Sequence, residues 1–371
     1  MKRYSVEMVR DASTKYFYIR DNETMEVELL PAKYLTHMVR ANRSPNTIRR
    51  SAFSICYYME YMRDQQMGLV DVYQLGYEAQ FDYFAGFLEW LRRGEHKENP
   101  IKIPNNGTCN AYLKDVFRFY LFMEMEEGQS GMINVLSYNQ ITMSNAVGVK
   151  KTLRSRSFKG YLKTEERKVR AAEKSEIMTI LQACTNCRDQ VLILLSAELG
   201  YRIGEILGID YTKDIDYEKR IIKVDFRADN ENDARAKNAE ERGGKISEDT
   251  FQFLLYYISE YWSVLQKQSY LFVNIKGSTT GKPMKVDSVY DMFERMEKKT
   301  GIRITPHMLR RYYANARWEA GWPLELISQS LGHKHLDTTI RYLNVLDDKL
   351  ETASRDFYNK YSGLYGIKEL L

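Results

Sequence analysis

The segment from residue 305 to residue 342, TPHMLRRYYANARWEAGWPLELISQSLGHKHLDTTIRY, limits the possible structures of this chain more than any other. It holds three of the five histidines of the protein. Thr305 is a good N-cap and Pro306 suits the first helical position, so a helix is predicted to begin beneath His307. His307 and Arg310 are then spaced i, i+3 on one face near a helix N-terminus, where partial positive charge favours an anion. This pattern is typical of a side-chain pair that faces a phosphate.

A second helix is predicted from Pro323 to Leu331, because it opens with proline and stops at Gly332, a residue that suits the position after a helix. His333 is then presented just beyond the helix end. A third short helix is predicted to carry Tyr342, nine residues after His333. The chain has 28 tyrosines, so the order and spacing of these residues carry more information than any one of them alone.

An arginine upstream of this segment is placed by a break in an apolar helix. The stretch CRDQVLILLSAELG is apolar nearly all round, which indicates burial at a domain centre. Gly200 ends it, and Arg202 follows at the start of the next predicted helix. An arginine just past a buried helix has to be satisfied, either by Glu205 or by a ligand phosphate. Alternating residues in RIIKVDF and GGKIS then predict a β-hairpin.

These features together resemble the tyrosine recombinase (phage integrase) family over about residues 172 to 350. The resemblance rests on the order and separation of Arg202, Lys237, His307-x-x-Arg310, Leu331-Gly332-His333 and Tyr342. Its most specific part is the pattern LGH-x-x-x-x-TT-x-x-Y. Arg311 departs from the family pattern, because many members have histidine at that position, and we interpret the change as tolerated.

The chemistry of phosphodiester transfer explains three of these residues. Negative charge rises on the non-bridging oxygens, so the site needs fixed cations, a nucleophile and a proton donor. Arg202 and Arg310 suit the cations, because each planar guanidinium can bond two oxygens at once. The phenol of Tyr342 suits the nucleophile and would form a 3′-phosphotyrosyl intermediate without ATP. The chain has no GxxxxGK[ST] loop, and we expect no metal and no cofactor.

The resemblance implies roles for the other residues of the series. Lys237 lies in a hairpin similar to that of transposase-type recombinases and would protonate the leaving 5′ oxygen. Lys245, in the returning strand, is the alternative general acid. His307 and His333 would both contact the scissile phosphate, with His307 taking the tyrosine proton and His333 stabilising the transition state. The residues alone do not divide these last two duties.

The predicted fold class is mostly α with a small β-sheet (α+β). Short runs such as YFYIR and EVELL predict strands near the N-terminus, and amphipathic patterns from Pro31 onward predict a four-helix unit. The resemblance implies that this unit is a SAM-like core-binding domain that forms a C-shaped DNA clamp with the catalytic domain. The predicted divisions are 1–30 (short β segments), 31–148 (helical domain), 149–171 (basic linker), 172–350 (catalytic domain) and 351–371 (a tail that docks onto a neighbouring subunit).

Basic residues predict where DNA is bound. Residues 150 to 170 hold nine Lys or Arg against two Glu, which favours a strap along a nucleic-acid backbone over a merely solvated linker. Basic residues near a helix start in the N-terminal unit suit backbone contacts, although surface charge is the alternative. The candidate DNA contacts are Arg43, Arg49, Arg50, Lys150, Lys151, Arg154, Arg156 and Lys159.

Composition excludes several other classes. No apolar run approaches the roughly eighteen residues that a membrane span needs, and the start MKRYSVEMVRD has no apolar signal region. We therefore expect an intracellular protein, cytoplasmic and associated with the nucleoid, with no membrane partner. Cys184 and Cys187 form a single CxxC with no second pair, so neither a zinc site nor a redox pair is expected.

The predicted function is site-specific recombination by an integrase or transposase of a mobile element. The expected partners are double-stranded DNA attachment or terminal-repeat sites, bound by a homo-tetramer with one dimer per site. An accessory directionality factor or a partner recombinase is a further possible partner. The alternatives are a type IB topoisomerase, which shares the site, and a sequence-specific DNA-binding protein that keeps the fold without its chemistry.

Overall fold

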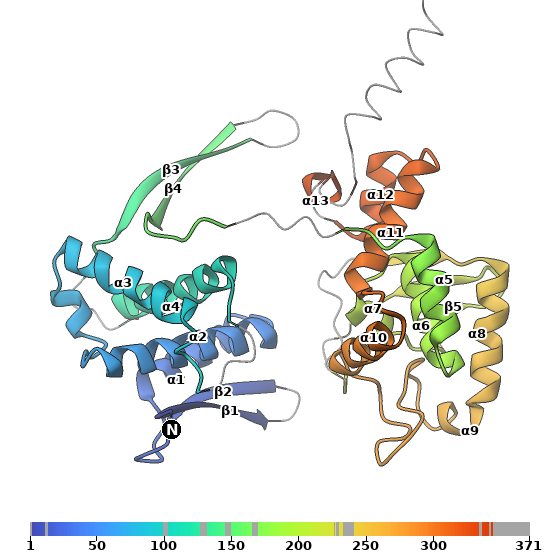
Figure 1. The fold of residues 1–371 in the computed structure, drawn as a ribbon, viewed down its shortest axis with the longest axis horizontal. Coiled ribbons are helices and arrows are strands. Elements are labelled where there is room, and N and C mark those ends of the chain that lie inside the picture. The colour runs from blue at the N-terminus through green and yellow to red at the C-terminus, as the bar shows by residue number, and fades with distance from the viewer. Residues whose placement is uncertain are drawn as a thin grey trace, which may run out of the picture. The chain divides into compact units, whose positions relative to one another are not determined.

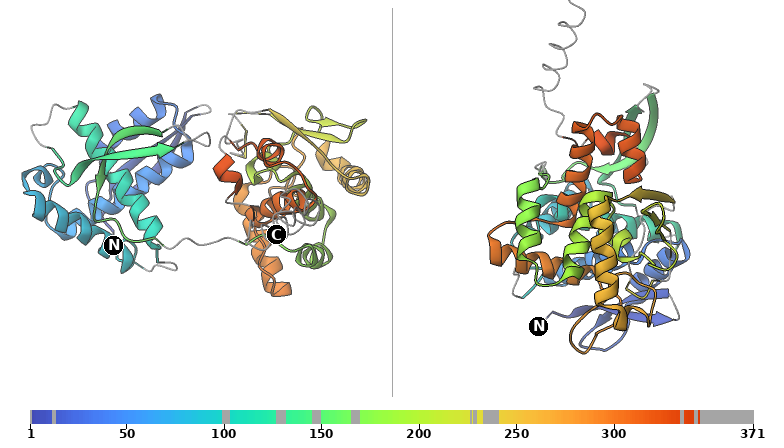
Figure 2. Two further views of the ribbon diagram at one scale, coloured as in Figure 1. Left: turned by 90° about the horizontal axis from the view of Figure 1, so that it is seen from above. Right: turned by 90° about the vertical axis from the view of Figure 1, so that its right-hand side faces the viewer.

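The computed structural model divides the chain into two compact units, Met1–Arg167 and Lys168–Leu371 (Figure 1), and each is considered by itself. Figure 2 shows both units from two further directions. The structure describes residues 2–11, 14–98, 103–126, 132–144, 150–164, 170–225, 227, 230–232, 241–333, 336–340 and 343. Within these ranges, the side chains of residues 137–144, 150–156 and 337 are not described.

The first unit begins with an antiparallel hairpin of β1 (Tyr4–Asp11) and β2 (Thr14–Asp21). Phe17 and Ile19 of β2 are buried in the core of this unit. The predicted strand in the EVELL run is wrong: Val27 forms only an isolated bridge with Arg20, and α1 begins at Leu29. The run is too short to extend the sheet before the helical pattern takes over.

Among its described residues, the first unit has four α-helices as its body, with one 3-10 turn, η1 (Asp71–Gln74), between the second and third. Ser44 caps the second helix: its side chain accepts from the backbone N–H of Thr47, and Pro45 occupies the first helical position. The core is rich in aromatic rings, and the hydroxyls of Tyr58 and Tyr120 lie 2.8 Å apart within it. The helices are α1 (Leu29–Arg40), α2 (Pro45–Asp64), α3 (Tyr77–Arg92) and α4 (Asn106–Glu126).

A second hairpin leaves the helices of the first unit, formed by β3 (Leu136–Ser144) and β4 (Lys150–Phe158). Its register runs from Leu136 opposite Phe158 to Ser144 opposite Lys150. The predicted linker over residues 149–171 is therefore corrected: its first part is a strand. Leu136 and Phe158 explain the difference, because both are buried in the aromatic core and anchor the base of the hairpin. The many basic residues of this segment indicated a solvent-exposed linker, so the two buried anchors were not recognised in the sequence.

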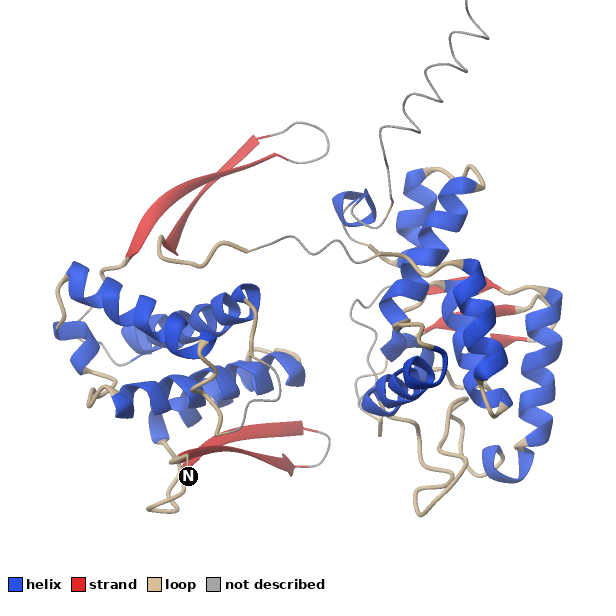
Figure 3. Cartoon of the chain, in the orientation of Figure 1, coloured by secondary structure: helices blue, strands red, loops and turns tan. Residues whose placement is uncertain are grey.

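The second unit is built around α6 (Cys187–Leu199), whose side chains are almost all buried. The same unit contains a small antiparallel sheet, seen in red in Figure 3, with its strands in the order β5-β6-β7. The other helices are α5 (Lys174–Ala183), α7 (Ile203–Leu207), α8 (Glu248–Glu260), α9 (Trp262–Leu265), α10 (Val286–Thr300), α11 (Pro306–Glu319), α12 (Leu324–Leu331) and α13 (Leu336–Ile340). The strands are β5 (Ile215–Asp216), β6 (Ile221–Val224) and β7 (Arg242–Lys245).

The apolar run YLFVN at residues 270–274 does not form a strand in the second unit, although its composition suits one. Tyr270 and Val273 make only isolated bridges, with Asp210 and Pro283. Leu271, Phe272 and Val273 are fully buried, so the run serves as a core segment of a loop. A short apolar run satisfies either role, because burial alone does not require a neighbouring strand. Within the described ranges, no helix combines the length and apolarity that crossing a membrane requires.

Candidate active site

A glycine turn after α6 presents the first candidate ligand. Gly200 caps α6 with a φ of 61°, a left-handed conformation that favours glycine. A Cβ at this position would lie 2.5 Å from the ring of Tyr313, so close packing also requires glycine. The turn places Arg202 at the N-cap of α7, as predicted.

Glu205, one of the two partners that the sequence allowed, holds the Arg202 side chain. Nη1 of Arg202 donates to Oε1 of Glu205 at 3.0 Å, and the backbone N–H of Arg202 donates to Oε2 at 2.7 Å. Nη2 of Arg202 also reaches the carbonyl oxygen of Gly332 at 3.4 Å. The Arg202 side chain keeps 25% of its surface exposed, so its outer edge is still available to a ligand.

Arg310 is the most deeply buried of the candidates, at 2% exposed, and it joins three segments of the chain. Its Nη1 donates to the carbonyl of Gly200, and its Nη2 donates to the carbonyl of Leu331, both at 2.6 Å. Its Nη2 also lies 2.9 Å from Nε2 of His333. Arg310 lies on helix α11, and Thr305 caps that helix as predicted. The guanidinium is thus oriented before any substrate arrives.

The hydrogen bonds of His333 define its tautomer. A guanidinium can only donate, so Nε2 of His333 accepts from Arg310. Nδ1 must then carry the proton and donate to Oγ1 of Thr339, 2.8 Å away. Burial, followed by the charges of Arg310 and Arg202, lowers the pKa of His333 to about 3. The ring is therefore neutral at physiological pH.

His307 occupies the first turn of α11 at the surface of the unit. Partial desolvation of its ring, and then the charges of Arg311, Arg310 and Arg202, lower its pKa below the ordinary value of 6.5. His307 also lies one helical turn before Arg310 on α11, so both side chains share one face of that helix. Arg202, His307, Arg310 and His333 therefore belong to one cluster, assembled from α7, α11 and the turn after α12.

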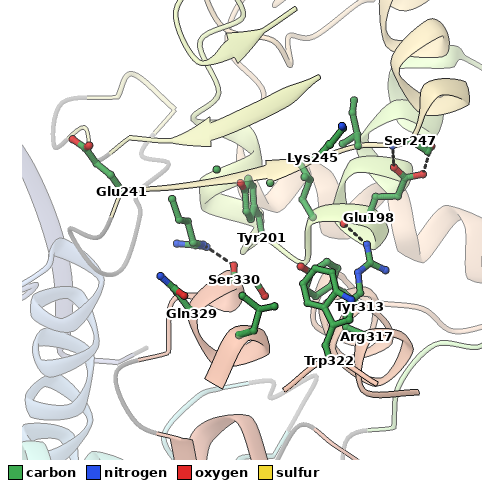
Figure 4. A pocket seen from close by; sticks show the side chains of 16 residues that line it. Glu198, Tyr201, Glu241, Lys245, Ser247, Tyr313, Arg317, Trp322, Gln329 and Ser330 are labelled. Carbon is green, nitrogen blue, oxygen red and sulfur yellow. Dashed lines mark hydrogen bonds between the residues drawn. The ribbon is translucent and has the colours of Figure 1, made fainter. Parts of the chain in front are cut away.

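Two predicted catalytic residues, Lys237 and Tyr342, lie outside the described residues. The third predicted helix, α13, ends at Ile340, so its described part does not include Tyr342. Lys245, the alternative to Lys237, is exposed on β7 and borders a pocket of 730 Å³ (Figure 4). This pocket is formed by β7 together with parts of α6, α11 and α12.

Arg242, also on β7, was not singled out from the sequence although it contacts the candidate cluster. Its Nε donates to the carbonyl of Ser330 at 3.0 Å, and its Nη2 donates to Glu205. The sequence contained only a weak indication that Arg242 belongs to the site, namely its position at the start of the short strand RGGK. No periodic pattern distinguishes such a residue from an ordinary surface charge.

The CxxC cysteines are part of the helix packing. Cys184 follows α5 and donates from its Sγ to the carbonyl of Ile180 at 3.3 Å, while Cys187 begins α6. Burial raises the pKa of the Cys184 thiol to about 12. In the part of the chain that the structure describes, no group of three or more His, Cys, Asp or Glu side chains could hold a metal ion.

The candidate DNA contacts differ in their surroundings. Arg50 forms a two-point ion pair with the buried Asp115, at 2.8 and 3.1 Å. Arg49 lies over the ring of Phe53, while Arg43 is exposed. Lys159 is exposed just after β4, and the backbone of that strand carries Lys150, Lys151, Arg154 and Arg156. Arg50 therefore has an evident structural role in the first unit.

Comparison with known proteins gives consistent similarities. The phage integrase family model matches residues 167–349. Transposase A from transposon Tn554 of Staphylococcus aureus is 25% identical over 366 residues, which cover 93% of this chain and 94% of the transposase. Tyrosine recombinase XerA of Saccharolobus solfataricus is 30% identical over 187 residues, which cover 50% of this chain and 56% of XerA. The crystal structure of XerH site-specific recombinase bound to palindromic difH substrate, a post-cleavage complex, matches with a TM-score of 0.57 and 18% identity, covering 83% of this chain and 79% of XerH.

Proposed function

We propose that this chain, which belongs to the phage integrase family of tyrosine recombinases, is a site-specific DNA recombinase of a mobile element. It cleaves and rejoins DNA strands. The observation that carries the proposal is the meeting of Arg202, Arg310 and His333 at one point of the second unit. Similarity to the Tn554 transposase along nearly its whole length favours a transposase or integrase role over the type IB topoisomerase alternative.

The proposed reaction begins with capture of the scissile phosphate. Arg202 and Arg310 bond its non-bridging oxygens, and their fixed charges stabilise the negative charge that grows during transfer. Arg310 is held by two carbonyl groups, so little reorganisation is needed when the phosphate arrives. His333 accepts from Arg310 and so helps to orient the guanidinium that bonds the phosphate.

The proposed covalent step is an exchange of one phosphorus–oxygen bond for another. The phenolic oxygen of Tyr342 attacks phosphorus, a 3′-phosphotyrosyl bond forms, and the bond to the 5′ oxygen breaks. His307 takes the phenolic proton, a role that its lowered pKa supports because the neutral ring can act as a base. Lys237, or alternatively Lys245, gives a proton to the leaving 5′ oxygen. Attack by a 5′ hydroxyl reverses these steps and rejoins DNA, with neither ATP nor metal.

The test uses a nicked duplex that carries the end of the mobile element. Wild-type protein should form an adduct with DNA that survives denaturation, and Tyr342→Phe should form none. Tyr290→Phe, at a tyrosine that is 44% exposed on α10, is the matched control and should react like wild type. If wild type and Tyr342→Phe both bind the DNA without any adduct, the proposed chemistry is wrong and a binding role takes its place.

The proposed assembly is a homo-tetramer that joins two DNA sites, with a dimer on each. In this assembly the helical unit of residues 31–148 and the catalytic unit of residues 172–350 both bind DNA, and the tail of residues 351–371 docks onto a neighbouring subunit. The mass of the complex on DNA, measured by light scattering, should correspond to four chains and two duplexes. A complex of one chain on one duplex that still completes strand exchange would contradict the assembly. An accessory directionality factor and association with the nucleoid stay predictions.

A further inference from the structure

A third guanidinium lies beside the two proposed phosphate ligands. The Arg242 side chain on β7 is only 8% exposed. Its guanidinium carbon lies 4.9 Å from the centre of the Tyr201 ring, and its Nε donates to the carbonyl of Ser330. Burying an arginine carries a large desolvation penalty, so its contacts have to be strong ones.

The strongest of these contacts is with Glu205, which Arg242 shares with Arg202. The Glu205 side chain is fully buried. Its Oε1 accepts from Arg202, and its Oε2 accepts both from the backbone N–H of Arg202 and from Nη2 of Arg242. One carboxylate between two guanidiniums leaves one net positive charge. A simple pair of Arg202 with Glu205 would be neutral, so Arg242 keeps this side of the site attractive to a phosphate.

Arg242 also packs against the turn that carries His333. A Cβ placed on Gly332 would lie 2.7 Å from Nη1 of Arg242. Nη2 of Arg202 reaches the carbonyl of the same glycine. Among the described residues, Nη1 of Arg242 is buried without a hydrogen-bond partner, so its contact with this turn is one of close packing.

We propose that Arg242 is a positioning residue for strand cleavage. It holds Glu205, and through Glu205 it holds Arg202, while its contacts with Ser330 and Gly332 fix the turn that presents His333. The inference rests on the proposed function. A lysine at this position could not replace the arginine, because one ammonium group cannot reproduce the planar fork that spans Glu205 and the Ser330 carbonyl.

The experiment compares wild type, Arg242→Met, Arg242→Lys and Arg317→Met on the nicked element-end duplex. Arg317 is the matched control: it borders the same pocket, stacks 4.4 Å from the Tyr313 ring, and donates to the carbonyl of Glu198. Three quantities are measured for each protein: the single-turnover rate of adduct formation, the DNA dissociation constant and the thermal unfolding midpoint.

Arg242→Met should form the adduct about 10- to 100-fold more slowly than wild type. This is the range found in metal sites when a group that orients a ligand is removed, and Arg242 orients Arg202 in the same indirect way. Its DNA affinity should stay within about twofold, because phosphate contacts across the whole interface supply most of the affinity. Arg242→Lys should remain slow and serves as the readout if the methionine variant unfolds. Arg317→Met should cleave at the wild-type rate.

A second substrate separates positioning of Arg202 from proton donation by the neighbouring hairpin. It carries sulfur in place of the bridging 5′ oxygen, so its leaving group needs no proton. Arg242→Met should stay slow on this substrate. Recovery of the wild-type rate there, wild-type cleavage by Arg242→Met, or full activity of Arg242→Lys would each overturn the inference. An absence of any wild-type adduct would instead overturn the proposed function, and the inference would fall with it.

Discussion

At the scale of single residues, the site depends on groups whose charge state is set before substrate binds. Arg310 donates to the carbonyls of Gly200 and Leu331 and to the ring of His333. A ring that accepts from a guanidinium cannot also carry a proton on the accepting nitrogen. The neutral state of His333 is thus a geometric consequence as well as an electrostatic one.

The first prediction concerns pH. The pKa of His333 is about 3 in the folded chain against an ordinary 6.5, so below pH 6.5 the unfolded chain binds a proton that the folded chain does not. The free energy of unfolding should therefore decrease as the pH is lowered. This residue should contribute a loss of about 2 kcal/mol between pH 7 and pH 5. Denaturant unfolding followed by tryptophan fluorescence measures it, since three of the four tryptophans lie in the second unit. An equal pH dependence in His333→Gln would contradict the assignment.

The second prediction concerns Gly332, whose φ is 63° and whose Cβ position is blocked by Arg242. Gly332→Ala should lose more stability than the roughly 1–2 kcal/mol that a left-handed alanine costs, and adduct formation should slow as the turn shifts. Gly321→Ala is the matched control, because Gly321 has a φ of 81° and nothing within 4 Å of its Cβ position. It should show the backbone penalty alone. Equal stability and activity in the two variants would mean that the contact with Arg242 is unimportant.

At the scale of elements, each unit joins two elements through a shared buried carboxylate. Glu205 joins α7 to β7 in the second unit, and Asp115 joins α4 to α2 in the first. Asp115 is fully buried and accepts from Arg50 and Ser54 of α2 and from Arg118 of its own helix. A carboxylate in this position fixes how two helices pack, because it is stable only while its partners stay in place.

The third prediction follows from that interface. Asp115→Asn should lower the stability of the first unit by about 1–3 kcal/mol, because the fully buried amide has only one acceptor oxygen for the donors of Arg50, Ser54 and Arg118 and brings an N–H group among them. Glu89→Gln is the control: Glu89 pairs with Arg92 at 3.0 Å on the surface of α3, and its loss should change stability by no more than about 0.5 kcal/mol. Thermal unfolding of both variants measures the difference. Similar midpoints would show that α2 and α4 do not depend on the ion pair.

At the scale of the whole molecule, DNA binding should be distributed over both units and strongly dependent on salt. The basic strand β4 pairs with β3 in a hairpin that projects from the helices of the first unit (Figure 1). Buried Phe158 anchors the base of this hairpin. A paired ribbon holds basic residues at fixed spacing, whereas a loose linker would have to be ordered by the DNA itself. The hairpin is therefore a better candidate for a phosphate-binding strap than the linker predicted from its composition.

The fourth prediction tests this strap. Replacing Lys150 and Arg154 together by glutamine should reduce the log-log slope of DNA affinity against salt by about two, since each phosphate contact contributes about 0.9. Lys213→Gln with Lys219→Gln is the control, because these lysines are 75% and 71% exposed in the second unit and remove the same charge. Their slope should match that of wild type. An equal reduction in both double variants would show that only net charge matters.

Features that depend only on neighbouring residues could be predicted from the amino-acid sequence. Thr305 and Ser44 cap their helices because a cap needs only the next three residues. Gly200 and Gly332 end theirs because their own backbone conformation favours glycine. Arg202 and Glu205 meet because they are three residues apart. The order of these local features was also enough to indicate the family.

Contacts between residues that are far apart in the chain could be established only from the folded structure. Arg310 finds the carbonyl of Gly200 across 110 residues, and Arg242 finds Glu205 across 37. The β3–β4 hairpin was not predicted, because the many charged residues of β4 indicated a linker. Its strands are anchored by Leu136 and Phe158, which are buried in one core. Such pairings follow from the path of the backbone and from which buried groups must be satisfied together. No local pattern records that information, because the two partners meet only after the core between them has formed.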